Sequence, residues 1–367
     1  MIKRLTIFIA VALAACSCAT TRFTDYPTVF AHRGCWLSED NQTVNKESFL
    51  VPENSLSGVR MAVRFGYPSI ECDVRWTKDS VLVCMHDGTI NRTMRLKDGQ
   101  KPIEGKVRVN ETDFKTLRDK YRLQSSEEQY REQIPTFEEM LLECKKCGIK
   151  PILHCDIYEG YEVAKRILGD EFYGFTSDYE VARKLRKISD CLIFFSMDKP
   201  KGRDTIEPKE ILDRLDGIGG RTGVSSMWYG MTTKNICEVL KATGHENQSS
   251  IFPTPHEMDA VRNGATILLS DFCWKPSEGM RPIVTETIRK VGSFEGPKLE
   301  LGAMTVVVEG TGDCEVTIDG FRKYQISHKK AGKEMLSVRF CRRAPEVELK
   351  PAEGASYKCR IAVYEIE

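Results

Sequence analysis

The sequence predicts an α/β fold, a TIM (β/α)8 barrel followed by a small all-β domain. Between residues 28 and 292, short apolar runs alternate with amphipathic helical patterns, which is typical of parallel strands joined by crossover helices. This stretch holds eight candidate strands, and its length is close to the roughly 250 residues that such a barrel needs. From Phe294 onward alternating strands replace this pattern, so residues 293–367 are expected to form an accessory β-sandwich-like domain.

The candidate barrel strands are short apolar runs: Val29–His32, Ser69–Val74, Val81–Met85, Pro151–Ile157, Cys191–Met197, Val224–Trp228, Ser250–Thr254 and Ala265–Ser270. The candidate helices carry apolar residues at helical spacing: Asn54–Phe65, Thr136–Cys147, Tyr161–Leu168, Tyr179–Ile188, Thr233–Ala242 and Pro255–Asn263. The strands expected in the second domain are Met304–Glu309, Cys314–Ile318, Met335–Phe340, Val347–Leu349 and Lys358–Tyr364. Two Gly-containing joints, Glu309–Asp313 and Asp319-Gly320, predict hairpin turns between some of them.

Composition excludes several classes of protein. The 367 residues include 54 Lys and Arg against 53 Asp and Glu, and a net charge of +1 gives no electrostatic case for a nucleic-acid partner. A content of 41% hydrophobic and 29% charged residues is that of a folded globular protein, which excludes wholesale disorder. The only sustained apolar run, Ile7–Ala15, has roughly nine residues and is too short to cross a bilayer, so a polytopic membrane protein is excluded.

The amino-terminal residues resemble a bacterial lipoprotein signal. Lys3 and Arg4 precede the apolar run, and Leu13-Ala14-Ala15-Cys16 resembles a lipobox, in which cleavage precedes the cysteine and lipid is attached to it. We therefore expect residues 1–15 to be a signal peptide and residues 16–27 a polar tether. The expected product is an exported bacterial lipoprotein, periplasmic or on the cell surface, with its membrane anchor on Cys16. The alternative is an ordinary secretory signal.

The fourteen cysteines do not predict a disulfide framework. Cys16 would carry the lipid, and the cysteines that remain are odd in number and have diffuse spacing. The pair Cys144 and Cys147 has the spacing of a redox motif, but it closes an amphipathic pattern that ends at Gly148, so helix-end cysteines are expected. Cys72 and Cys155 neighbour acidic residues in apolar runs. Strand alternation turns them to the opposite face, and we expect buried free thiols.

Reactive residues cluster at the predicted strand ends, where a barrel of this kind carries its chemistry. The first strand ends in His32-Arg33-Gly34, and the third ends in His86-Asp87. Glu71 and Asp73 lie two residues apart on the second strand, so their carboxylates share one face and can bind a hard cation such as Ca²⁺ or Mg²⁺. Asp156, at the end of the fourth strand, could supply a third oxygen ligand.

The order of these motifs resembles the glycerophosphodiester phosphodiesterase family across about Val29 to Pro276. Each motif alone is weak, whereas this many in order are a strong signal. The matching segments are His32-Arg33-Gly34, Pro52-Glu53-Asn54-Ser55, Gly66, Ile70-Glu71-Cys72-Asp73-Val74, Thr77-Lys78-Asp79, His86-Asp87, Arg92-Thr93, Ile134-Pro135-Thr136-Phe137-Glu138-Glu139, Gly264 and Ser270-Asp271.

The resemblance implies a barrel of the phosphodiesterase type and a role for each matching residue. It implies that Glu71, Asp73 and Asp156 hold a divalent cation, with Glu53 binding it directly or supporting another ligand. It also implies that His32 and His86 are the catalytic acid and base, and that Arg33 binds the phosphate. Asn54 and Ser55 are equally compatible with substrate contact and with capping a helix. His154 shares a strand face with Asp156, and a packed or supporting histidine is expected there.

Three departures from the family pattern bear on the substrate. Residues 35–51 form a longer insertion than is usual. The fourth strand reads Asp156-Ile157-Tyr158 in place of the common Glu-x-Lys, so Tyr158 is expected to contact substrate through its hydroxyl without the fixed charge. Pro253-Thr254 replaces a usual Trp-Thr pair. Trp228 follows a later strand and is expected either to line the mouth of the site or to pack.

The expected reaction is metal-dependent hydrolysis of glycerophosphodiesters to glycerol phosphate and an alcohol, a step of lipid and glycerol metabolism. One alternative is a related phosphodiesterase acting on teichoic-acid-like or inositol-containing substrates. Another is a non-catalytic lipoprotein that retains the barrel pocket and binds a surface, with its C-terminal domain contacting carbohydrate. The presence of both His32 and His86 favours the enzyme.

Overall fold

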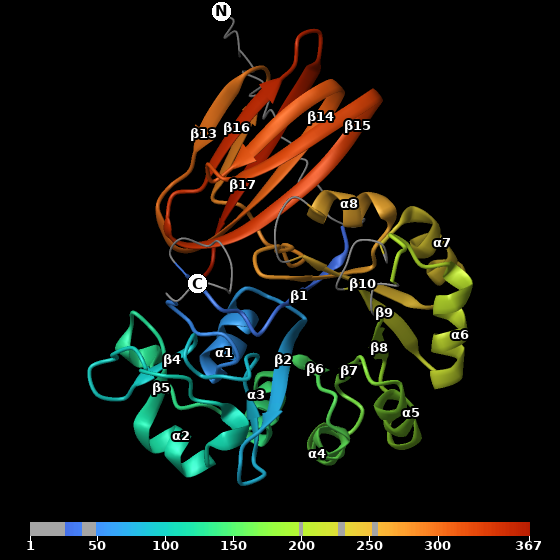
Figure 1. Ribbon diagram of the computed structural model, residues 1–367. Helices are drawn as coiled ribbons and strands as arrows, with labels where there is room; N and C mark the ends of the chain where they lie inside the picture. Colours follow the sequence, from blue (N-terminus) through green and yellow to red (C-terminus); the bar gives the residue numbers. More distant parts are fainter. Residues whose placement is uncertain (1–25, 39–48, 198–200, 227–231, 252–255) are drawn as a thin grey trace, which may run out of the picture.

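The structure, a computed structural model, describes residues 26–38, 49–197, 201–226, 232–251 and 256–367. Eight parallel strands form a closed barrel, because β1 pairs with both β11 and β2 (Figure 1). The predicted fold class is thereby confirmed. The barrel strands are β1 Thr28–Ala31, β2 Ser69–Trp76, β6 Lys150–His154, β7 Tyr173–Thr176, β8 Ile193–Ser196, β9 Thr222–Ser226, β10 Glu246–Ile251 and β11 Ile267–Ser270.

The helices surround the barrel, and local sequence signals fix their ends. Thr136 forms a capping box with Glu139 at the start of α3, and Gly148 ends that helix with a left-handed backbone (φ 67°). Cys144 and Cys147 therefore lie in the last turns of a helix, as predicted. The helices around the barrel are α1 Leu56–Arg64, α3 Phe137–Cys147, α4 Tyr158–Leu168, α5 Tyr179–Ile188, α6 Pro208–Ile218, α7 Lys234–Ala242 and α8 His256–Asn263.

One predicted barrel strand lies outside the barrel, and one barrel strand was not predicted, so the predicted number of eight strands is still correct. The run Val81–Met85 is not a barrel strand, because β3 (Leu82–Cys84) pairs antiparallel with the far end of β2, outside the closed ring. The barrel strand β7 escaped prediction because its apolar run is short and interrupted by Gly174. Glycine allows close packing there, since a Cβ would lie 2.6 Å from Cδ2 of Leu185 on α5, and that side chain would have to move.

The segment between β3 and α3 folds beside the barrel as a small unit with its own core. Val83, Met94, Leu117 and Ile134 are fully buried within it. It contains β4 Met94–Leu96, α2 Phe114–Lys120, β5 Tyr121–Leu123 and two short 3-10 helices, Val109–Glu111 and Glu128–Tyr130. Neither α2 nor α6 was predicted from the sequence.

The C-terminal domain is an antiparallel six-stranded sheet that curls into a near-barrel. Its strands are β12 Val284–Ile288, β13 Gly292–Glu295, β14 Leu299–Ile318, β15 Arg322–Arg343, β16 Glu346–Pro351 and β17 Ser356–Glu365. The hairpin predicted at Glu309–Asp313 is wrong: β14 continues through it, with a register shift between Gly310 and Gly312. The turn at Asp319-Gly320 is confirmed. Although β12 precedes the predicted boundary at residue 293, it pairs with β17.

Buried side chains separate into an inner and an outer layer, as strand alternation requires. Phe30, Phe175 and Phe194 fill the inside of the barrel. Cys72 and Cys155 belong to the outer layer, on the opposite face from the acidic side chains, and both are buried free thiols as predicted. All twelve cysteines in the described part of the chain are free, which agrees with the absence of a predicted disulfide framework.

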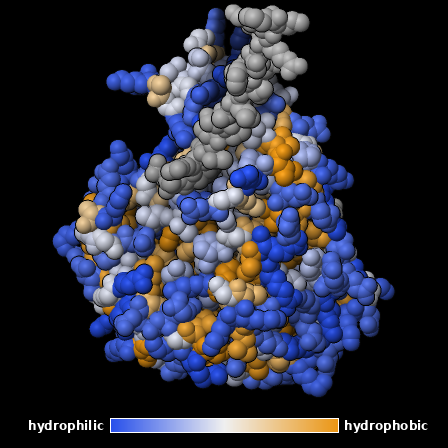
Figure 2. Space-filling view, turned by 180° about the vertical axis from the view of Figure 1, so that it is seen from behind, coloured by the Kyte–Doolittle hydropathy of each residue, from blue (hydrophilic) through white to orange (hydrophobic). Residues whose placement is uncertain are grey.

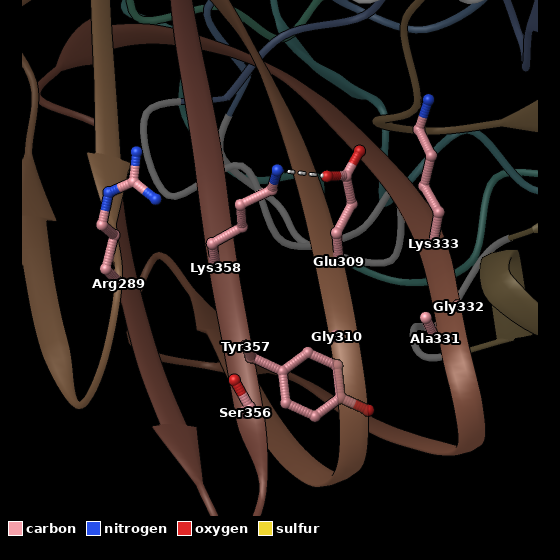
Figure 3. Close-up of a pocket in the computed structure, with 9 residues that line it drawn as sticks. All are labelled: Arg289, Glu309, Gly310, Ala331, Gly332, Lys333, Ser356, Tyr357 and Lys358. Atoms are coloured by element: carbon pink, nitrogen blue, oxygen red, sulfur yellow. Dashed lines mark ion pairs between the residues drawn. The ribbon is translucent and has the colours of Figure 1, made fainter.

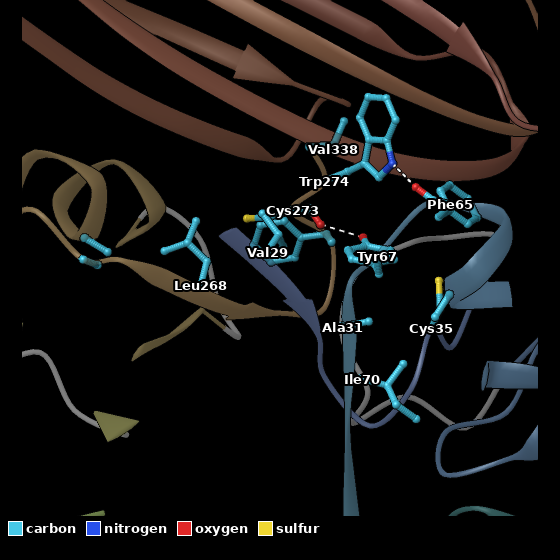
Figure 4. Packing of buried hydrophobic residues seen from close by; sticks show 14 of the residues in the cluster. Val29, Ala31, Cys35, Phe65, Tyr67, Ile70, Leu268, Cys273, Trp274 and Val338 are labelled. Atoms are coloured by element: carbon cyan, nitrogen blue, oxygen red, sulfur yellow. Dashed lines mark hydrogen bonds between the residues drawn. The ribbon is translucent and has the colours of Figure 1, made fainter. Parts of the chain in front are cut away.

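The C-terminal domain takes the place of the eighth barrel helix. The segment that follows β11, residues 271–283, contains no helix. Instead, Trp274 of this segment and Val338 of β15 lie over outward-facing residues of the barrel such as Val29 and Leu268 (Figure 4). The indole of Trp274, fully buried, donates to the Phe65 carbonyl at 2.7 Å. The two domains therefore share one continuous core.

The face seen in Figure 2 is mostly hydrophilic, with scattered apolar spots. Within the described ranges, no helix is both long enough and apolar enough to cross a membrane.

The buried carboxyl of Glu257 predicts an unusual pH dependence of stability. Glu257 lies between the domains and accepts from the hydroxyl of Tyr26, and burial raises its pKa from 4.5 to about 8. Between these pH values the unfolded chain releases a proton that the folded protein keeps, so this carboxyl lowers the free energy of unfolding as pH rises. Glu257→Gln should remove that loss, and its stability relative to wild type should rise by up to about 1.4 kcal/mol per pH unit.

Urea unfolding at pH 5, 6, 7 and 8 measures this difference, with the exposed Glu278→Gln as the matched control. If the free energies of unfolding of wild type and Glu257→Gln change in parallel with pH, the carboxyl is ionised in the folded protein and the prediction is wrong.

Candidate active site

The site lies at the carboxyl ends of the barrel strands, where β2 extends beyond the ring. Because β3 runs back along this extension, Met85 N–H donates to the Asp73 carbonyl and His86 returns to the barrel mouth. A cleft of about 460 Å³ opens there. The residues that line it are Asp73, Val74, Arg75, Trp76, Met85, His86, Gly88, Arg108, Val109, Asn110, His154, Asp156 and Ile157.

Glu71, Asp73 and His154 form a cluster whose donor atoms all lie within 4.8 Å of one another. The Nδ1 atom of His154 is 3.1 Å from Oδ1 of Asp73 and 3.4 Å from Oε1 of Glu71. Glu71 is fully buried, and its Oε1 accepts no well-aligned hydrogen bond from the described residues. A buried carboxylate oxygen without a donor is costly, and a cation would compensate it.

The electrostatics of this cluster also favour a cation. Burial would by itself lower the pKa of His154, but its hydrogen bond to Asp73 and the negative charges of Asp73 and Glu71 outweigh this effect and raise that pKa to about 10. Burial would raise the pKa of Asp73, but His154, His86 and Arg33 hold it well below its usual range. The carboxylates thus attract positive charge, and a divalent cation bound here would displace the proton of His154, because histidine binds a metal as the neutral imidazole. The donor set fits such a cation.

Asn54 and Ser55 have separate roles. The Ser55 hydroxyl accepts from Gly58 N–H and caps α1, one of the two alternatives weighed from the sequence. Asn54 pairs with Asp73 twice: its amide donates to Oδ2 at 2.9 Å, and its oxygen accepts from the Asp73 N–H at 3.0 Å. Asn54 therefore fixes the orientation of Asp73.

Glu53 lies apart from the Glu71–Asp73–His154 cluster and binds arginines. Arg92 donates to both of its carboxylate oxygens, at 2.7 and 2.9 Å, and Nη1 of Arg33 lies 3.4 Å away. Arg33 also reaches Asp73, with Nε at 3.7 Å from Oδ2, and its backbone N–H donates to Glu71 at 2.8 Å. Direct metal binding by Glu53 stays a prediction, and in this geometry it supports the two arginines.

The two histidines predicted to be catalytic are held in the same way. Nδ1 of His32 lies 2.6 Å from Asp271, and Nδ1 of His86 lies 2.7 Å from Asp87. In each neutral ring the carboxylate favours the proton on Nδ1, which makes Nε2 the basic nitrogen. The His32 pair is buried, whereas the His86 side chain is 38% exposed at the cleft. The structure thus places two oriented imidazoles at the barrel mouth.

Other predicted residues lie outside the metal cluster. Asp156 lines the cleft, but it accepts from the backbone N–H and hydroxyl of Ser177 at 2.9 and 3.0 Å, so its role as a ligand stays a prediction. Tyr158 begins α4, does not line the cleft, and has Lys184 Nζ 5.7 Å from its ring centre. Trp228 and Pro253-Thr254 lie outside the described residues.

Sequence reasoning gave no role to several residues that the structure brings to the site. Asp271 was noted as a motif at the end of β11, but its pairing with His32 joins positions 239 residues apart. Trp36, inside the insertion, donates its indole N–H to the same Asp271 oxygen at 3.0 Å. The Arg92-Thr93 motif was noted, whereas the bidentate contact of Arg92 with Glu53 was not. A carboxylate directly after a barrel strand was the available signal for Asp271.

The closed parallel barrel thus has at its mouth an acidic cluster that could hold a cation, two histidines and several arginines, a combination that suits metal-assisted hydrolysis of a phosphoric ester. Residues 32–199 match the model of the glycerophosphoryl diester phosphodiesterase family. This part of the chain is therefore similar to that family.

Individual relatives agree with the family match over short stretches. The chain is 34% identical over 98 residues to mouse glycerophosphodiester phosphodiesterase 1 and 40% identical over 65 residues to the glycerophosphodiester phosphodiesterase of Caldanaerobacter subterraneus. These stretches are 25% and 18% of this chain and 26% and 22% of the two relatives.

The fold is also similar to solved structures. A candidate glycerophosphoryl diester phosphodiesterase from Silicibacter pomeroyi matches with a TM-score of 0.52 at 16% identity, covering 67% of this chain and 90% of that one. A candidate glycerophosphodiester phosphodiesterase from Galdieria sulphuraria matches with a TM-score of 0.50 at 18% identity, covering 67% and 94%. At these low sequence identities, the similarity shows a shared fold.

The cluster predicts that Asp73→Asn weakens cation binding. The substitution removes a carboxylate charge but retains an oxygen that can accept from Asn54, so the fold should survive while the affinity for Ca²⁺, Mg²⁺ or Mn²⁺ falls at least about 10-fold. Calorimetric titration measures the affinity, and the exposed Asp113→Asn is the control. Equal affinity in the wild type and Asp73→Asn would exclude this cluster as the cation site.

Proposed function

We propose that this protein hydrolyses glycerophosphodiesters to glycerol phosphate and an alcohol, with Ca²⁺ or Mg²⁺ as its cofactor. The observation that carries the proposal is the Glu71–Asp73–His154 cluster beside two histidines, each oriented by its own aspartate. The family match over residues 32–199 supports the same reaction class.

In the proposed reaction the chain supplies the proton transfers and the positioning. When bound, the cation supplies charge neutralisation at the phosphodiester. Glu71, Asp73 and His154 would hold it, and Asn54 keeps Asp73 in place. One imidazole takes a proton at Nε2 from the attacking oxygen, and the other, protonated, gives a proton to the leaving alkoxide. Asp271 and Asp87 stabilise the charge that each ring carries in turn.

The residues that line the cleft bear on the preferred substrate within this class. Arg75 and Arg108 line the cleft and can face an anionic headgroup, whereas the hydroxyl of Tyr158 does not line it. A teichoic-acid-like or inositol-containing diester is the alternative substrate. The oriented His32 and His86 support turnover over a role in binding alone, because a binding pocket needs no paired acid and base.

We also propose export and anchoring through lipid on Cys16, with the C-terminal domain in contact with a surface carbohydrate. The support for the anchor is Leu13-Ala14-Ala15-Cys16, which lies outside the described residues. The support for a surface contact is a hollow of about 570 Å³ on the C-terminal sheet. There Arg289, Lys358 and Lys333 lie in one row with Glu309, which pairs with Lys358 at 2.8 Å (Figure 3). Such a row suits an acidic sugar.

Removing either histidine tests the reaction. His32→Ala and His86→Ala should each lower kcat by about 10²- to 10⁴-fold with a smaller effect on KM, because each ring transfers a proton in the transition state. Release of glycerol phosphate from glycerophosphocholine and glycerophosphoinositol, with added metal, measures turnover. His245→Ala is the matched control, since that ring contacts Thr222, away from the cleft. Wild-type turnover in either variant would remove that histidine from the mechanism.

The anchor is tested separately from catalysis. Mass spectrometry should find lipid on a mature amino-terminal Cys16, and Cys16→Ala should release a soluble protein. Turnover on water-soluble diesters should stay unchanged, since the proposed catalytic residues all lie after Ala31. A wild-type protein that fractionates as soluble with an unmodified terminus would contradict the anchor and leave the reaction unaffected.

A further inference from the structure

We propose that Arg339, a residue of the C-terminal domain, positions the His32–Asp271 pair of the barrel. The inference deepens the proposed function and rests on it where activity is concerned. It assigns to the β domain a part in building the active site, in addition to covering the barrel.

Arg339 holds the backbone of Asp271 and that of Trp36, whose indole contacts the Asp271 carboxylate. It projects from β15, is completely buried, and donates Nη1–H to the carbonyl of Trp36 and Nη2–H to the carbonyl of Asp271. Its backbone N–H donates to the carbonyl of Phe272 at 2.9 Å. One guanidinium therefore ties the loop after β1 to the loop after β11, and its planar fork sets the distance between the two carbonyls.

These two loops define the environment of His32. The Trp36 indole N–H and the His32 Nδ1 both contact Oδ1 of Asp271, at 3.0 and 2.6 Å. A shift of the Trp36 backbone moves the indole donor, and a shift of the Asp271 backbone moves the carboxylate itself. Either shift changes the orientation of the buried His32 ring.

The environment of Arg339 indicates a specific role rather than a general link between domains. A buried cation is costly unless it is fully partnered, and this one lies over the rings of Trp36 and Tyr67 at 5.6 and 6.0 Å. By contrast, Arg262 of α8 joins Glu334 of β15 at 2.7 Å and is partly exposed. That second interdomain pair has no contact with Asp271 or Trp36, so it provides a matched control.

The test compares Arg339→Met, Arg339→Lys and Arg262→Met in the full chain. Displacement of a catalytic group by about 1 Å costs on the order of 10²-fold in rate, so Arg339→Met should lower kcat by about 10- to 100-fold with KM within about threefold of wild type. Arg339→Lys keeps the charge but loses the fork, and should recover only part of kcat. Arg262→Met should retain wild-type kcat.

A second readout does not depend on activity. The short contact of the buried His32 Nδ1 with Asp271 should give a downfield imidazole proton in the NMR spectrum of a His86→Gln background, which removes the other paired histidine. This signal should be lost or broadened in Arg339→Met and present in Arg262→Met. It should also be weakened by Trp36→Phe, which keeps an aromatic ring but removes the indole donor to Asp271. If Arg339→Met does not fold, Arg339→Lys takes its place, and the signal should be broadened there too.

The outcomes separate the two hypotheses. Loss or broadening of the downfield proton in Arg339→Met, or in Arg339→Lys, supports the positioning role even if the wild type hydrolyses no glycerophosphodiester, in which case the proposed function alone fails. An unchanged proton with unchanged kcat in folded Arg339→Met or Arg339→Lys overturns the positioning role and leaves the proposed function intact.

Discussion

The pairing of β1 with both β2 and β11 is the constraint on which the site depends. It brings His32, Glu71 and Asp271 to one edge of the barrel from positions up to 239 residues apart. The register matters as much as the closure. A slip of one residue in β2 would turn Glu71 and Asp73 into the apolar outer layer and bring Cys72 inside, so the buried carboxylates themselves resist any other register.

Charge balance is the second constraint, because several carboxylates are buried within a small volume. Glu53 is stabilised by two hydrogen bonds from Arg92, which also donates to Asp87, and Asp87 in turn orients His86. A proton on the His86 ring would therefore lie beside Asp87, whose pKa burial would raise but His86 and Arg92 hold well below its usual range. The arginines thus offset the cost of burying these carboxylates beside the imidazoles.

Local signals predicted most of the fold, and long-range contacts account for what was missed. The helix limits followed caps such as Thr136 and Gly148, and Glu71 and Asp73 followed from strand alternation. Prediction failed at β7, where Gly174 serves a neighbouring helix, and at β14, which continues through glycines that suggested a turn. It could not find the role of Asp271, since only closure of the barrel brings this residue to His32.

The C-terminal domain shows how such closure can depend on residues outside the barrel. The family match ends at residue 199, whereas Asp271 and Arg339 lie far beyond it. In this chain β15 covers the gap that an eighth helix would otherwise close, and Trp274 and Arg339 are buried in that interface. A domain that replaces a structural helix must supply its apolar contacts, and here it also contributes a cation beside the loops that hold His32. The geometry of the site therefore depends on how the C-terminal domain packs against the barrel.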